Sequence, residues 1–128
     1  MAEAARVVEA YVGEYASGKS ENAVNRAISL LATGQPVTIA DLDLVEPCYT
    51  LRPLKKRLQA LGLTVLAWDT GDTVGMGEAG QTIMPQVRWV LRRAGHIVLD
   101  VGYGVHGAGI INLVEGAAKD KDLRVLLV

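Results

Sequence analysis

The chain has 128 residues, which is enough for one compact domain with its own core and hardly enough for two. Half of the residues are apolar and 21% are charged, so the composition is globular and lies outside the disordered range. Thirteen basic and fourteen acidic residues leave a net charge of −1, so no electrostatic footprint indicates nucleic acid or an anionic membrane as a partner.

The N-terminus, the apolar runs and the cysteine count together favour a cytoplasmic protein. Residues 1–8 lack the basic region and the long apolar run of a signal peptide. No stretch approaches the roughly 20 apolar residues that a membrane-spanning helix needs. Cys48 is the only cysteine, so an intrachain disulfide is excluded and a cysteine-based zinc site is not expected.

Apolar patterning alternates between strand and helix character along the chain. Strands are expected over 7–12, 37–42, 63–68, 96–101 and 123–128, and helices over 21–32, 51–61, 81–94 and 110–119. Residues 69–80 hold four glycines and no apolar periodicity, and are expected to form a loop. This order predicts a three-layer α/β/α fold with a mainly parallel five-stranded sheet covered on both faces. We expect one domain over 1–128. Because the chain stops on an apolar strand, this domain is expected to be either whole or the N-terminal part of a longer protein.

The segment between the first strand and the first helix matches the pattern G-x-x-x-x-G-K-[ST] at every position. A polyphosphate needs converging backbone N–H groups, a helix N-terminus, one cation and a hydroxyl for magnesium. We expect Lys19 to reach the β- and γ-phosphates and Ser20 to ligate the metal. The competing interpretation is a glycine-rich turn that holds a lysine by chance. The candidate nucleotide contacts in this segment are Gly13, Glu14, Tyr15, Ala16, Ser17, Gly18, Lys19, Ser20 and Glu21.

Acidic residues stand at the ends of two further predicted strands. Asp41 and Asp43 close the second strand, and Asp100 closes the buried strand 96–101. Ligands of open parallel sheets bind beyond the carboxyl ends of the strands, so these carboxylates are expected beside the phosphates. Asp43 is expected to position an attacking water, and Gly102 to let the backbone approach the γ-phosphate. The predicted metal ligands are therefore Ser20, Asp41, Asp43 and Asp100; the alternative is that the aspartates only cap the following turns.

Two other patterns are expected to carry no chemistry. The run Lys119 to Asp122 resembles the Lys-x-Asp motif that reads guanine, but it precedes a strand where that motif follows one, so a solvated turn is expected. His96 and His106 lie on different predicted elements without acidic or cysteine companions at ligand spacing, so they are not expected to bind metal.

These motifs, in this order, resemble the MinD/ParA/CobQ-like (SIMIBI) class of P-loop ATPases. More narrowly, they resemble an uncharacterised bacterial group in that class that reads approximately G-E-Y-G-S-G-K-T, then D-L-D-I-V-N-P-Y-F-R-S-R, then D-V-G-G. Residues 41–47 of this chain read D-L-D-L-V-E-P, and Arg52 falls on the second arginine of that string. The resemblance implies binding of ATP and Mg²⁺, with Lys19, Asp43 and Arg52 as catalytic residues and Arg52 as the candidate arginine finger in cis.

Two departures from that class shape the expected function. Glu14 stands where MinD and ParA relatives carry a lysine that acts across a nucleotide-sandwich dimer, and the chain ends before the strands that hold the base. We therefore expect magnesium-dependent binding of a nucleoside triphosphate, with slow or partner-activated hydrolysis. A homodimer or a partner protein remains open, and so do two alternatives. One is a small-molecule or polynucleotide kinase with its acceptor site in 69–80. The other is a non-catalytic, nucleotide-gated module that orders 46–52 and 103–109 to dock a partner.

Overall fold

The computed structural model describes residues 5–14, 17–42, 51–67, 85–103 and 109–128. Its strands are β1 (Val8–Gly13), β2 (Val37–Leu42), β3 (Thr64–Leu66), β4 (His96–Tyr103) and β5 (Leu123–Leu127). Its α-helices are α1 (Lys19–Leu30), α2 (Lys55–Ala60) and α3 (Pro85–Arg88). Short 3-10 helices are η1 (Leu31–Thr33), η3 (Arg52–Leu54), η6 (Val90–Arg92), η7 (Ile110–Leu113) and η8 (Ala117–Lys119).

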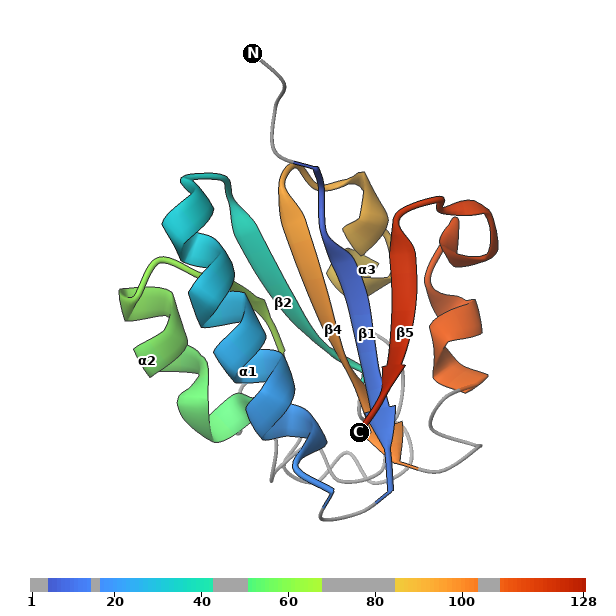
Figure 1. The fold of residues 1–128 in the computed structure, drawn as a ribbon, viewed down its shortest axis with the longest axis horizontal. Coiled ribbons are helices and arrows are strands. Elements are labelled where there is room, and N and C mark those ends of the chain that lie inside the picture. The colour runs from blue at the N-terminus through green and yellow to red at the C-terminus, as the bar shows by residue number, and fades with distance from the viewer. Residues whose placement is uncertain (1–4, 15–16, 43–50, 68–84, 104–108) are drawn as a thin grey trace.

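The five strands form one sheet in the order β3-β2-β4-β1-β5, and every pair of neighbours is parallel. The strand that enters the glycine-rich segment, β1, therefore lies between β4 and β5 (Figure 1). Since all strands run the same way, their carboxyl ends meet at one edge, which is the lower edge in Figure 1. The predicted parallel five-stranded α/β fold is confirmed.

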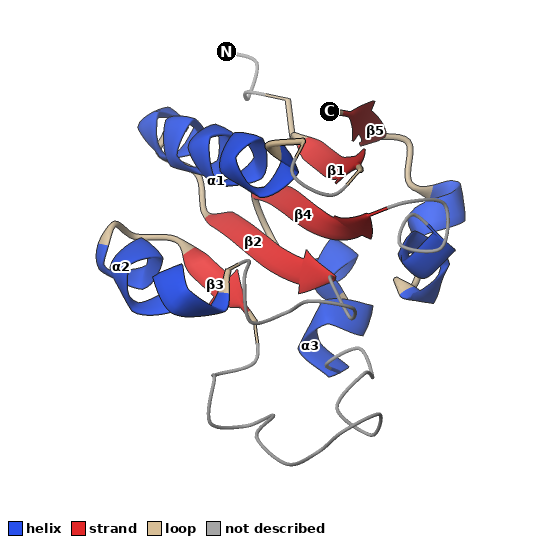
Figure 2. Ribbon diagram, turned by 90° about the horizontal axis from the view of Figure 1, so that it is seen from below, coloured by secondary structure: helices blue, strands red, loops and turns tan. Residues whose placement is uncertain are grey.

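Helices cover both faces of this sheet, as parallel strands require. In Figure 2, α1 and α2 lie on one side of the strands, and α3 and residues 110–119 lie on the other. The pleat of β1 divides its side chains between two cores: Val8, Ala10 and Val12 pack toward α3 and residues 110–119, while Tyr11 packs toward α1. Both cores are built mainly from Val, Ile, Leu and Ala.

The strand predictions fare better than the helix predictions. The strand expected over 37–42 has the bounds predicted for it, whereas the helix expected over 110–119 is wrong. It is two 3-10 helices, because Val114 is extended (ψ 119°) and Gly116 adopts a left-handed conformation with φ 84°. The described part of the helix expected over 81–94 likewise breaks at Trp89, between α3 and η6.

The buried face of α1 is formed by small and apolar residues one helical turn apart. Ala23 and Ala27 are fully buried and Leu30 continues their stripe, while Ile28 is 37% exposed. The next helical position toward the N-terminus is held by a charged residue, the buried Lys19. The face of α1 that packs on the sheet therefore ends in the lysine of the glycine-rich motif. No helix in the described residues combines the length and the apolar character that crossing a membrane would require.

Candidate functional site

The glycine-rich segment joins β1 to α1 at the carboxyl edge of the sheet. Gly18 stands directly before α1 and has φ 86°, a conformation that side chains other than glycine rarely adopt. The Gly18 carbonyl accepts hydrogen bonds from the backbone N–H of Asn22 and from the Asn22 side chain, at 3.0 and 2.8 Å. This left-handed turn starts the helix, so its first backbone N–H groups face the end of β1, which is the arrangement that favours an anion.

The other motif glycine, Gly13, is held where no side chain fits. A Cβ atom on Gly13 would lie 2.7 Å from the Ser17 Oγ and 2.7 Å from the Val128 carbonyl oxygen. Within the part of the chain that the structure describes, the buried Ser17 hydroxyl has no hydrogen-bond partner. A close-packed backbone with a buried unsatisfied hydroxyl fits a phosphate cradle, because bound phosphate oxygens would accept the hydrogen bond that Ser17 has to give.

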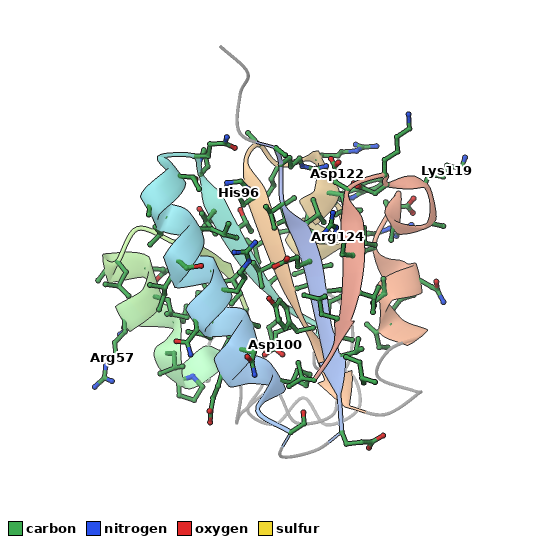
Figure 3. All side chains as sticks on the ribbon, in the orientation of Figure 1. Arg57, His96, Asp100, Lys119, Asp122 and Arg124 are labelled. Atoms are coloured by element: carbon green, nitrogen blue, oxygen red, sulfur yellow. The ribbon has the colours of Figure 1, made fainter. Side chains whose placement is uncertain are left out.

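A buried ion pair joins the first turn of α1 to β4. The Lys19 Nζ lies 2.9 Å from the Asp100 Oδ1, and the two side chains are 8% and 0% exposed. Figure 3 shows Asp100 between α1 and the sheet, near the carboxyl edge. The same ammonium lies 3.4 Å from the Ser20 Oγ. Lys19, predicted to serve the phosphates, thus contacts two residues that are predicted to serve the metal.

A second carboxylate lies on the strand beside Asp100. Asp41 of β2 is the register partner of Asp100 of β4, and Tyr11 of β1 is its partner on the other side. Residues paired in a parallel sheet point to the same face, so Tyr11, Asp100 and Asp41 form a row beneath α1. Beyond this row the register of β1 and β4 shifts between Tyr11 and Gly13, so β4 fits one extra residue there. The buried Gly102 falls in this irregular stretch.

The arrangement fits a magnesium ion bound together with a phosphate. Among the described residues, no three His, Cys, Asp or Glu side chains come together as a metal cluster, so a site made by protein ligands alone is not present there. Mg²⁺ in nucleotide sites is commonly held by one or two carboxylates, a hydroxyl, waters and the phosphates themselves. Asp41, Asp100 and Ser20 supply that set, so they remain the candidate metal ligands.

Several predicted site residues are placed less fully. Glu14 and Glu21 are both exposed, on either side of the glycine-rich segment. Arg52 is the first residue of η3, and its role as an arginine finger stays a prediction. Asp43, Tyr15 and Ala16 lie outside the described residues, as do most of the segments 46–52, 69–80 and 103–109 on which the alternative functions depend.

A polar network that was not predicted from the sequence adjoins the row beneath α1. The Tyr11 hydroxyl donates to the Glu9 Oε1 at 3.1 Å, and the Arg26 Nε of α1 donates to the same oxygen at 2.8 Å. Burial, followed by the Glu9 charge, raises the pKa of Tyr11 to about 12, so the phenol stays protonated and keeps donating. The only signal was two polar residues at alternate positions of an otherwise apolar strand. This network fixes Tyr11, the residue beside Asp100.

The two features expected to be bland lie at the opposite edge of the sheet. Figure 3 places His96, Lys119 and Asp122 near the amino ends of the strands, far from Asp100. Asp120 and Asp122 accept from the Arg6 guanidinium at 3.2 and 3.5 Å, so the Lys-x-Asp run is a turn braced by Arg6. His106 lies outside the described residues.

Solved structures of the same fold are found among proteins called FtsY. The cell division protein FtsY of Thermotoga maritima matches with a TM-score of 0.66 and 20% identity, over 97% of this chain and 43% of that chain. The signal recognition particle receptor FtsY of Elizabethkingia anophelis matches with a TM-score of 0.63 and 18% identity, over 97% of this chain and 41% of its own. Its complex with GDP matches with a TM-score of 0.60 and 16% identity, over 99% and 41%.

The comparisons establish the fold class of the chain. This chain spans less than half the length of the matched FtsY chains. No family model matches the sequence, and no curated protein matches it. The order and direction of the strands, the glycine-rich segment between β1 and α1, and the likeness to FtsY together show a three-layer α/β/α fold with a parallel five-stranded sheet. The fold that the motifs implied is therefore confirmed.

Proposed function

We propose that this chain binds the polyphosphate of a nucleoside triphosphate, together with Mg²⁺, at the carboxyl edge of its sheet. The observation that carries the proposal is the contact between Lys19 and Asp100 directly behind the left-handed turn at Gly18. A buried ion pair is not needed for stability, because apolar residues of similar size usually serve as well or better. The pair lies at the N-terminus of a helix that follows a P-loop motif, so phosphate binding explains its presence better than stability does.

Each described residue of the site would have a distinct part in binding. The Lys19 ammonium would neutralise the β- and γ-phosphates, and the first N–H groups of α1 would hold their oxygens. Mg²⁺, when bound, supplies charge neutralisation of the phosphates, and Asp41, Asp100 and Ser20 would hold it. Gly13 would let the backbone approach the phosphates, because a side chain there has no room.

We propose ATP as the nucleotide that the chain binds, and slow hydrolysis as its activity. The resemblance to the MinD/ParA/CobQ-like class favours ATP, while the E. anophelis FtsY complex contains GDP, which makes a guanine nucleotide the alternative. Asp43 would orient the attacking water and Arg52 would stabilise the transferred phosphoryl group. An arginine finger is worth about 10³- to 10⁵-fold in rate. Because Glu14 replaces the lysine of the dimer-activated relatives, we expect turnover to stay slow unless a partner supplies a cation.

Calorimetric titration of the wild type and Lys19→Ala with Mg-ATP and Mg-GTP tests the proposal. Lysine 19 would make a charge-assisted contact worth about 1.5–3 kcal/mol, so its removal should weaken binding about 10- to 100-fold. Lys121→Ala, which removes an exposed lysine near the opposite edge, is the matched control and should bind like the wild type. Circular dichroism confirms that each variant is folded at the titration temperature. Equal affinities of the wild type and Lys19→Ala for both nucleotides would contradict the assignment.

A further inference from the structure

The ion pair between Lys19 and Asp100 engages two groups that the proposed function assigns to different ligands. Lys19 is assigned to the phosphates and Asp100 to Mg²⁺, yet in the structure they contact each other at 2.9 Å. Both side chains are almost fully buried, at 8% and 0% exposure, so water screens neither charge. Nucleotide binding must therefore exchange this contact for new ones.

Metal-free nucleotide meets an electrostatic obstacle at this site. If Lys19 turns to the phosphates, its ammonium moves away from a fully buried carboxylate. The negative phosphates also come close to Asp100, and like charges repel strongly where the local dielectric is low. Asp41, the register partner of Asp100, adds a second carboxylate to the same row. A polyphosphate alone thus binds against the charge of the row beneath α1.

Mg²⁺ alone meets the opposite obstacle. Asp100 already has the Lys19 ammonium at hydrogen-bond distance, so a cation that approaches this carboxylate meets a like charge. The Ser20 Oγ, the other predicted ligand from this turn, also lies 3.4 Å from the same ammonium. Neither ligand by itself removes the obstacle that it meets. The two together do, because Lys19 then faces the phosphates while Asp100 faces the metal.

We propose that the Lys19–Asp100 ion pair makes nucleotide and Mg²⁺ binding mutually dependent, so that the site admits the two only as a pair. This inference rests on the proposed function and deepens it. By linkage, the factor by which Mg²⁺ strengthens nucleotide binding equals the factor by which nucleotide strengthens Mg²⁺ binding. One part of this factor comes from the direct attraction between Mg²⁺ and the nucleotide, which also exists in water. The ion pair accounts for the rest. It follows that removing either charge of the pair should strengthen binding of one ligand in the absence of the other.

The first arm of the test titrates ATP and GTP, in EDTA and in saturating Mg²⁺, into the wild type, Asp100→Asn and Asp122→Asn. Asp100→Asn should bind metal-free nucleotide about tenfold more tightly than the wild type, which corresponds to about 1.4 kcal/mol of relieved repulsion. Its gain from Mg²⁺ should shrink by at least the same factor. Asp122→Asn makes the same chemical change at the opposite edge, where Asp122 contacts Arg6, and should match the wild type throughout.

The second arm uses a different variant, so the proposal stays testable if Asp100→Asn does not fold. Lys19→Met removes the ammonium and keeps an unbranched side chain of similar length. Mg²⁺ alone should bind Lys19→Met at least about fivefold more tightly than the wild type, measured by calorimetry or by competition with Mn²⁺. If neither variant gains affinity for its single ligand, the proposal is overturned. If the wild type fails to bind nucleotide even with Mg²⁺, the proposed function itself is wrong, which is a distinguishable result.

Discussion

The two edges of the sheet contain the same kinds of feature but differ in what those features contact. Each edge has a glycine with no room for a side chain, a buried titratable residue and an ion pair. At the amino edge, Gly95 packs on Pro36, His96 bonds to Val7 and Thr33, and Arg6 pairs with Asp120. These contacts lie within the chain and use up the polar groups that they involve.

The carboxyl edge leaves comparable groups available to a ligand. The Ser17 hydroxyl is buried there without a partner among the described residues, and it takes up the place of a Cβ atom on Gly13 together with the Val128 carbonyl oxygen. The ion pair of Lys19 and Asp100 joins groups that both have phosphate or metal chemistry. A buried polar group therefore indicates a binding site when a ligand can replace its partner within the protein. It indicates a purely structural contact when no ligand can do so. The predictions below test this difference, from the largest expected effect to the smallest.

Gly95→Ala should have the largest effect on stability. Gly95 has φ 84°, and a Cβ atom there would collide with the Pro36 carbonyl oxygen, which also accepts the His96 N–H at 2.8 Å. Strain and the collision together should lower the free energy of unfolding by about 3 kcal/mol, measured by urea denaturation. The protein that remains folded should bind Mg-nucleotide with unchanged affinity. A loss of affinity in the folded fraction would mean that the two edges are not independent.

Gly13→Ala should lower nucleotide affinity more than it lowers stability, the reverse of Gly95→Ala. The new Cβ atom would lie 2.7 Å from the Ser17 Oγ, which can rotate away, and 2.7 Å from the Val128 carbonyl oxygen, which is backbone and must shift. Unlike Gly95, Gly13 does not have a positive φ, so an alanine adds no left-handed backbone strain. We expect the free energy of unfolding to fall by only about 1–2 kcal/mol. Affinity for Mg-nucleotide should fall about tenfold or more, because the added methyl group blocks close approach of the phosphates. A variant with normal nucleotide affinity would show that Gly13 serves packing alone.

The pH dependence of stability should come partly from His96 at the amino edge. Its Nδ1 accepts from the Val7 N–H at 3.0 Å, so the neutral ring carries its proton on Nε2 and donates to the Thr33 Oγ1 at 3.1 Å. Burial, and secondarily the Arg26 charge, lowers the pKa of His96 from its ordinary value of 6.5. Just below pH 6.5, His96 therefore binds a proton in the unfolded chain but stays neutral in the folded chain. Stability from this residue is therefore complete above pH 6.5 and is lost as the pH falls toward the lower folded pKa.

Urea denaturation of the wild type and His96→Gln between about pH 7.5 and pH 5.5 measures this contribution. The wild type should lose more stability over that interval than His96→Gln, although the variant starts from a lower value. Nucleotide affinity at neutral pH should be the same for both proteins. Parallel pH profiles would show that the folded protein does not exclude the proton from His96.

Local patterns predicted much of this structure because they depend on neighbouring residues. The alternation of apolar strands with helices is enough to predict a parallel sheet, and β2 has the bounds that its apolar run predicted. A helix was predicted directly after the P-loop motif, from residue 21, and α1 begins two residues earlier, at Lys19. The break in residues 110–119 was missed, because Gly116 can end a helix or stand within one, and its tertiary packing decides which.

Contacts between distant residues were beyond the reach of the sequence. Lys19 and Asp100 are 81 residues apart in the sequence. Their contact depends on the strand order, in which β4 and not β2 is the neighbour of β1 on that side. The motifs named both residues but not their ion pair. Likewise, the spacing of Arg26 and Glu9 gives no sign that α1 crosses β1 where the two side chains meet. Sequence patterns thus predict which residues form the site, and the strand order determines which of them touch.

Mapping of backbone amide chemical shifts by NMR tests the central claim most directly. Saturating Mg-nucleotide should shift the amide signals of Gly18, Lys19 and Ser20 strongly, while those of Gly95, His96 and Ile97 at the amino edge should stay nearly unchanged. The same titration with Lys19→Ala, at equal nucleotide concentration, should give much smaller shifts at Gly18 and Ser20. Large shifts confined to the amino edge, or no shifts at either edge, would contradict the account.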